Sequence, residues 1–137
     1  MSRNIWLNVL YTFIVAIVLN LVVYFIGNAL GISWDTNQGI VGPVPVVMAS
    51  AIGAALGCIG YWLLGLFAGD NQRIWFIWLA TIFGVLSMIT PWTGANDIGT
   101  MAFLGIMHVV VVLVMTWYLG VWTPTYIAAE DIAASPS

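Results

Sequence analysis

The sequence predicts an all-α integral membrane protein, a bundle of four transmembrane helices joined by short loops. Four long apolar runs occupy most of the 137 residues, and the whole chain has only two basic and five acidic side chains. A helix of about 20 apolar residues spans the hydrocarbon core of a bilayer. A membrane β-barrel would need alternating polar and apolar residues, whereas stretches such as 109–114 are apolar on every side. The spanning elements are therefore expected to be helices.

We expect a single integral membrane domain over residues 1–137. Its helices are predicted at about residues 5–30, 44–68, 74–90 and 100–121, with a short tail at 122–137. Pro43 and Pro45 lie at the start of the second run, where a missing N–H costs least, and Pro91 is expected to end the third. The first run is too long for the apolar region of a signal peptide, so we interpret it as a retained helix.

The two basic residues predict the orientation of the chain. Arg3 precedes the first helix and Arg73 lies in the turn between the second and third, which is the same side of the membrane when the spans are even in number. The positive-inside rule therefore places both termini in the cytoplasm. The chain has no basic cluster, which argues against binding of nucleic acid.

Two helices carry patterns that predict helix packing. The second has small residues at four-residue spacing, Ala49, Gly53 and Gly57, which allow a neighbouring helix to approach closely. The first has a ridge with the same spacing: Asn8, Thr12, Ala16, Asn20, Tyr24 and Asn28. Because four residues turn a helix slightly more than once, this ridge lies on one slowly winding face. Near mid-membrane, Asn20 is expected to bond another helix, and a polar pathway is the alternative.

His108 is the only histidine and lies near the middle of the fourth run. Gly105 shares its face of the helix, and Asn20, Gly53, Gly84 and Ser87 are expected at similar depth on the other helices. We first expect a neutral imidazole that bridges helices by hydrogen bonds. Ligation of a haem or chlorophyll-type pigment is a second interpretation, because histidine nitrogen is a common ligand of such metals. A proton relay or a substrate site is the third.

Two loops and most of the tryptophans are expected at the membrane surfaces. Asp35 and Asp97 lie in the two loops opposite the termini, where a cation could bind if the loops meet. Seven of the eight tryptophans are near predicted helix ends, which is typical of interfacial anchors; they are Trp6, Trp34, Trp62, Trp75, Trp92, Trp117 and Trp122.

The chain resembles a family of small bacterial four-helix membrane proteins catalogued as a domain of unknown function. The resemblance covers roughly residues 5–120. It lies in a glycine- and alanine-rich second helix after a proline, in residues 86–91 (LSMITP) and in residues 107–110 (MHVV). It implies a bacterial cytoplasmic membrane and no particular activity, and it singles out Ser87, Pro91 and His108.

These observations favour a non-catalytic accessory or structural subunit that packs against larger membrane proteins. The chain has no carboxylate pair, no Ser/His/Asp set and no Cys/His cluster, so we do not expect an enzyme or a resident metal. Expected partners are membrane lipid and other integral membrane proteins or further copies of this chain. The alternatives are a small oligomeric transporter or channel that uses the ridge of the first helix, and pigment binding through His108.

Overall fold

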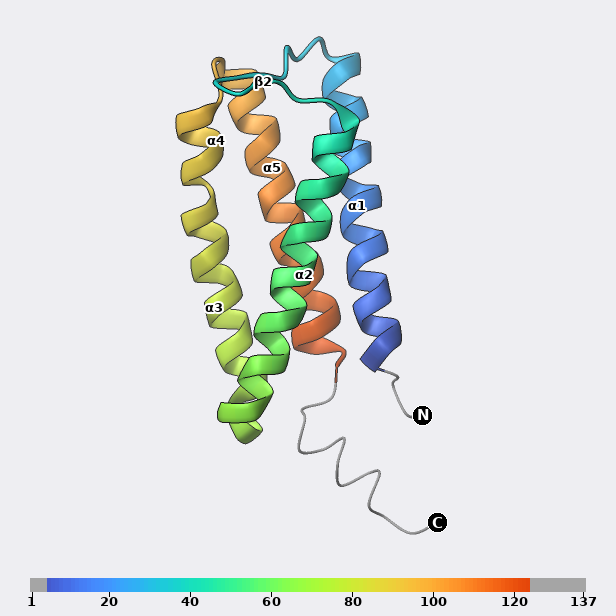
Figure 1. The fold of residues 1–137 in the computed structure, drawn as a ribbon, viewed down its shortest axis with the longest axis vertical. Coiled ribbons are helices and arrows are strands. Elements are labelled where there is room, and N and C mark those ends of the chain that lie inside the picture. The colour runs from blue at the N-terminus through green and yellow to red at the C-terminus, as the bar shows by residue number, and fades with distance from the viewer. Residues whose placement is uncertain (1–4, 124–137) are drawn as a thin grey trace.

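The structure is a computed structural model that describes residues 5–123. Arg3 and most of the predicted tail therefore lie outside the described residues. The elements, in chain order, are α1 (Ile5–Ala29), β1 (Asp35–Thr36), β2 (Gly39–Ile40), α2 (Pro43–Phe67), the 3-10 turn η1 (Gly69–Asn71), α3 (Gln72–Ser87), α4 (Ile89–Gly94), α5 (Ile98–Met115) and the π-helical segment η2 (Thr116–Val121). These helices form four roughly parallel columns (Figure 1), as the sequence predicts.

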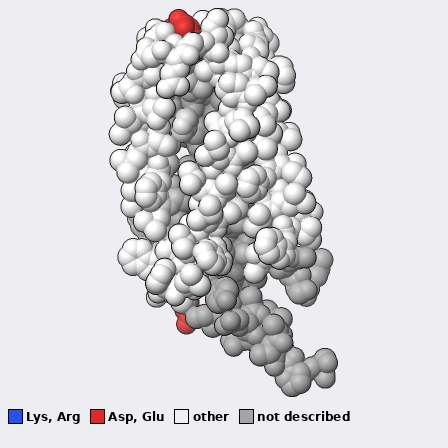
Figure 2. All heavy atoms as spheres, viewed as in Figure 1, with Lys and Arg blue, Asp and Glu red and all other residues white. Residues whose placement is uncertain are grey.

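Four segments are long and apolar enough to cross a membrane, namely Ile5–Ala29, Pro43–Phe67, Gly69–Gly94 and Ile98–Val121. Large apolar side chains on all four are exposed, among them Phe25, Leu56, Phe83 and Leu113. On the face shown in Figure 2 the side wall carries no charged residue, and acidic atoms lie only at the two ends. An apolar wall of this kind is stable in lipid rather than in water. The chain is an integral membrane protein.

The helices pack with α2 and α5 across the centre of the bundle, each in contact with the other columns, while α1 and α3 lie at opposite corners (Figure 1). Glycines allow this close approach. A side chain at Gly53 or Gly57 of α2 would meet Val111 or Met115 of α5. The Gly53–Gly57 part of the predicted small-residue face is therefore occupied by another helix of the same chain, while Ala49 is exposed.

The third column departs from the prediction at Pro91. The sequence predicted that this helix would end just before Pro91. Instead, α3 ends at Ser87, Met88 separates it from α4, and Pro91 is the third residue of α4. A proline ring clashes with the carbonyl four residues earlier, which here belongs to Ser87. The helix is interrupted at that residue, and Pro91 falls in the first turn of α4, where its missing N–H has no helical acceptor.

The bundle has two distinct ends. α1 begins and η2 finishes at the same end, which we call the terminal end, and β1 and β2 lie at the other, the hairpin end (Figure 1). At the hairpin end the two predicted outer loops meet. The Asn37 amide donates to the Gly94 carbonyl at 2.8 Å, and the Asn96 amide donates to the Asp35 carbonyl at 3.0 Å. These backbone bonds attach the β1–β2 hairpin to the turn between α4 and α5.

Trp34 corrects the prediction of interfacial anchors. It is only 2% exposed and packs inside the hairpin end, 4.8 Å from Tyr24 and 5.9 Å from Phe103 between ring centroids. Its backbone has a positive φ of 56°, which is uncommon for a residue with a side chain. The other six tryptophans of that set are exposed, as expected for anchors in the bilayer interface.

At the terminal end, side chains of three helices hold the last turn of η2. The Arg73 guanidinium donates to the Gly120 carbonyl at 2.6 Å and to the Val121 carbonyl. The Asn8 amide donates to the Trp122 carbonyl, and the Tyr61 hydroxyl donates to the Thr123 carbonyl, both at 3.2 Å. The last carbonyls of a helix accept no hydrogen bond within the helix, so these side chains satisfy them. The positive charge of Arg73 also interacts favourably with the negative end of the helix dipole.

Replacing Arg73 with Gln should therefore loosen the last turn of the final helix. We expect faster amide hydrogen exchange in residues 116–123. Exchange of the amides around Asn20, in the other half of the bundle, should change little because the capping bonds are local. Hydrogen exchange of the protein in lipid nanodiscs measures this. Gln72→Ala would not serve as a control, because Gln72 also bonds Tyr61; Asp70→Asn, an exposed change beside Arg73, should leave the exchange unaltered.

Candidate functional site

A buried polar pair joins α1 and α2 in the hairpin half of the bundle. The Asn20 amide nitrogen donates to the Ser50 hydroxyl at 2.8 Å, and that hydroxyl donates to the Val46 carbonyl at 2.7 Å. Asn20 is 3% exposed and Ser50 is 1% exposed. The predicted interhelical hydrogen bond of Asn20 is therefore present, and its partner is within the same chain.

Most of the polar ridge of the first helix is buried inside the bundle. Thr12, Ala16, Asn20 and Tyr24 are all buried against other helices. The Thr12 hydroxyl donates to the Asn8 carbonyl of its own helix at 2.8 Å, a bond that leaves it no need of an outside partner. Asn28, at the hairpin end of the ridge, is exposed. These contacts use the ridge for packing inside the bundle.

His108 does not bridge helices. Its Nδ1 lies 2.8 Å from the Leu104 carbonyl of its own helix. A carbonyl only accepts, so Nδ1 carries a proton and donates this bond. No residue in the range 5–123 donates a hydrogen bond to Nε2. The interhelical bond expected for His108 is thus replaced by one to the preceding turn.

The surroundings of His108 follow from its helical neighbours. One turn later, Val111 meets Gly53 of α2, and Val112 meets Gly84 of α3. Residues three and four apart share a helix face, so the half-buried imidazole lies on the face of α5 that points between α2 and α3. The imidazole therefore lies in the apolar part of the protein.

The other predicted residues of this region have separate contacts. Ser87 lies at the end of α3, and its hydroxyl donates to the Gly84 carbonyl at 2.7 Å. Gly105 has ordinary space around it, because an added Cβ would lie 3.7 Å from the sulfur of Met88. Gly53 and Gly57 contact α5 more tightly. Of the predicted residues Asn20, Ser87 and His108, Asn20 bonds a different helix, through Ser50 of α2, whereas the bonds of Ser87 and His108 stay within their own helices.

The hairpin end holds a polar cluster of Asp97, Ser33 and Thr100 at the start of α5. Asp97 is the N-cap residue, and its carboxylate accepts from the Thr100 amide at 2.8 Å and from the Ser33 hydroxyl at 2.5 Å. Capping of this kind satisfies an amide that has no partner in the helix. The Ser33 hydroxyl, followed by the hydroxyl and amide of Thr100, lowers the pKa of Asp97 from 3.8 to about 2.

This shift predicts a loss of stability in acid. A carboxyl whose pKa is lower in the folded protein stabilises the fold above its unfolded pKa, and the contribution disappears as pH falls through the folded value. We expect the thermal midpoint to fall between about pH 4 and about pH 2 through Asp97. Melting in detergent measures it. Asp97→Asn should flatten the acid limb, whereas Asp70→Asn, at the opposite end, should retain it.

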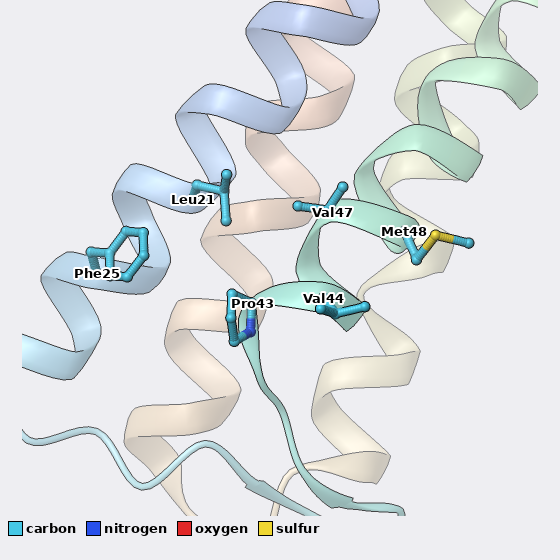
Figure 3. Close-up of a pocket in the computed structure, with 6 residues that line it drawn as sticks. All are labelled: Leu21, Phe25, Pro43, Val44, Val47 and Met48. Carbon is cyan, nitrogen blue, oxygen red and sulfur yellow. The ribbon is translucent and has the colours of Figure 1, made fainter.

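Between α1 and α2 the outer wall forms an open apolar groove of about 340 Å³. Leu21 and Phe25 line it from α1, and Pro43, Val44, Val47 and Met48 line it from α2 (Figure 3). The groove lies near the hairpin end, where the side chains of α1 and α2 leave a gap between the two helices. We call it the α1–α2 groove. Its shape and chemistry suit an apolar side chain or an acyl chain rather than a polar ligand.

Sequence reasoning missed three of the residues that organise these sites. Ser50 has no polar neighbour at helical spacing that would mark it, and Trp34 resembles the interfacial tryptophans in its position beside a helix end. Arg73 was assigned to orientation and to contact with lipid headgroups, and not to capping of the last helix. Within the described residues, no group of three or more His, Cys, Asp or Glu side chains could hold a metal ion.

Comparison with models of known protein families gives a match over most of the chain. The model of a family described as a family of unknown function (DUF6069) matches residues 1–122. The comparison with curated proteins gave no match, and neither did the comparison with solved structures. The match extends over all four spans.

Proposed function

Since the chain belongs to the family of unknown function DUF6069, which implies no activity, we propose a function from its surfaces: a non-catalytic membrane subunit that packs against a larger integral membrane protein. The α1–α2 groove carries this proposal. It is an apolar hollow on a wall that carries many exposed large apolar side chains. Helix association in lipid depends on close packing rather than on hydrophobicity, so a hollow of this size favours a ridge of another helix over disordered lipid.

The internal contacts of the bundle restrict where a partner would bind. Gly53 and Gly57 of α2 already face α5, and the ridge of α1 from Thr12 to Tyr24 is already buried within this chain. The partner is therefore assigned to the groove and not to those faces.

Photocrosslinking in the native host tests this assignment. A photoreactive amino acid at Met48, in the groove, should give one discrete adduct with a larger membrane protein. The same group at Phe83, which is 66% exposed on α3 at a distant corner, is the matched control and should give only lipid adducts. Lipid adducts alone at both positions would rule out the accessory role. Mass spectrometry of the Met48 adduct identifies the partner.

Pigment binding is a second candidate, and the tautomer of His108 favours it. Histidines that ligate metals usually donate their other ring N–H to a carbonyl or carboxylate, which orients the lone pair. The bond from Nδ1 to Leu104 has this form. The protein purified gently from its host should then absorb visible light, His108→Ala should abolish the absorbance, and Asn20→Leu should retain it. A colourless preparation excludes the pigment.

A transporter or channel has less support from the same contacts. The ridge that would line its route is buried and hydrogen-bonded inside the bundle. Transport along it would require α1 to separate from α2. In proteoliposomes, unchanged ion or solute flux after Asn20→Ala and His108→Ala would count against this function.

We assign the protein to a bacterial cytoplasmic membrane with the terminal end in the cytoplasm. Arg73 at that end supports this orientation through the positive-inside rule. In a Cys58→Ala background, a membrane-impermeant thiol reagent on intact cells should label a cysteine at Gln38, at the hairpin end. It should not label one at Asn71 until the membrane is opened. Both positions are exposed, so the reagent can reach either one from its own side of the membrane. The reverse labelling pattern would show that the terminal end faces outward.

A further inference from the structure

Two buried polar atoms in the hairpin half lack hydrogen-bond partners among the described residues. They are Oδ1 of Asn20 and Nε1 of Trp34. The two residues are 3% and 2% exposed. An unpaired polar atom inside a membrane protein is at least as costly as a lost hydrogen bond, so each such atom requires an explanation.

The hydrogen bonds of Ser50 fix which end of the Asn20 amide is unpaired. Ser50 uses its single proton on the Val46 carbonyl, so toward Asn20 it can only accept. The amide nitrogen must therefore face Ser50, and the oxygen must face away from it. The unpaired oxygen is a property of this network and not of an arbitrary choice between the two ends of the amide.

The two unpaired atoms are complementary and belong to neighbouring parts of one core. Asn20 can only accept through Oδ1, and an indole can only donate. Trp34 packs with Tyr24, Val46 and Met107 in a buried cluster. Tyr24 is one turn from Asn20 on the same face of α1, and Val46 accepts the bond of Ser50. The same two residues, Tyr24 and Val46, therefore connect Trp34 to the Asn20–Ser50 pair.

We propose that buried water occupies this region, donating to Oδ1 of Asn20 and accepting from Nε1–H of Trp34. Water is the smallest ligand with both functions, and buried waters typically satisfy polar groups that protein atoms leave unpaired. This hydration site lies in the half of the bundle nearer the hairpin, beside the buried cluster of Tyr24, Trp34, Val46 and Met107. It is independent of the proposed accessory role and of any ligand on His108.

Nuclear Overhauser contacts between water and tryptophan indoles test the proposal. The full chain, labelled with ¹⁵N-tryptophan and held in nanodiscs, should show a water cross peak at the Trp34 indole N–H. The resonance that Trp34→Phe removes is assigned to Trp34. Residues 33 and 34 form the only Ser-Trp step in the chain, so paired ¹³C-serine and ¹⁵N-tryptophan labels identify the Trp34 backbone without any variant.

Two further variants separate water from nearby hydroxyl protons. Tyr24→Phe removes the closest aromatic hydroxyl and should leave the cross peak in place. Asn20→Leu removes the oxygen that would hold the water and should abolish the peak. Absence of a water contact at Trp34 in the wild-type protein would overturn the proposal, as would a contact that disappears with Tyr24→Phe and persists with Asn20→Leu.

Discussion

Trp34→Ala should lower the free energy of unfolding by about 3–5 kcal/mol, the range for truncating a buried large aromatic residue. The indole ring is almost fully enclosed and contacts Tyr24 and Phe103. It also lies directly over Gly27, where an added Cβ would be 2.4 Å from ring atom Cζ2. Truncation leaves a cavity among α1, α5 and the hairpin that rigid neighbouring helices cannot fill.

The positive φ of Trp34 leads to a less intuitive companion result. Alanine at this position keeps the left-handed backbone strain, which is about 1–2 kcal/mol for a residue with a Cβ. Glycine adopts positive φ readily. Trp34→Gly should therefore be less destabilising than Trp34→Ala, although glycine is the smaller residue. The reverse order would show that packing alone determines stability at this position.

Reversible unfolding in mixed detergent micelles measures both variants. Trp92→Ala is the matched control, because Trp92 is at the same end of the bundle and is 75% exposed. Its replacement should change stability little. An equal loss for Trp34→Ala and Trp92→Ala would contradict the buried position of Trp34.

The contrast between these two tryptophans shows where sequence reasoning is effective. The bilayer imposes a length and an apolar composition on each span, so the limits of α1 and α2 were predicted within one residue. Burial within the bundle leaves no such signal. Because lipid and protein interiors are both apolar, a tryptophan in the core and one at the interface have similar neighbours in the sequence.

Polar residues show the same division. The four-residue spacing on α1 predicted a face, and the part of that face from Thr12 to Tyr24 is buried. It could not predict Ser50 as the partner of Asn20, because the pairing depends on how α2 is rotated and positioned against α1. Nor could it predict that His108 bonds Leu104, since a hydrogen bond to the preceding turn is always available to a helical side chain. Helix rotation is determined by packing and not by hydropathy.

Gly84→Ala should be more damaging than the alanine substitutions of Gly57 and Gly60, with a loss of about 1–3 kcal/mol from overpacking. An added Cβ would lie 2.5 Å from a Val112 methyl carbon and 3.3 Å from the other. Valine is branched at Cβ and stiff at χ1, so it cannot turn away. At Gly57 the clash is with the flexible Met115 side chain, which can move aside. The loss for Gly57→Ala should be smaller.

A compensating change separates this steric cause from a general intolerance of alanine in α3. Val112→Ala removes both methyl groups, so Gly84→Ala should be much less destabilising in that background than in the wild type. Gly60→Ala, with nothing within 4 Å of its added Cβ, should be neutral or stabilising, because alanine favours helices over glycine. Equal losses at Gly84, Gly57 and Gly60, or strict additivity of the Gly84 and Val112 changes, would show that α3 and α5 do not meet at this contact.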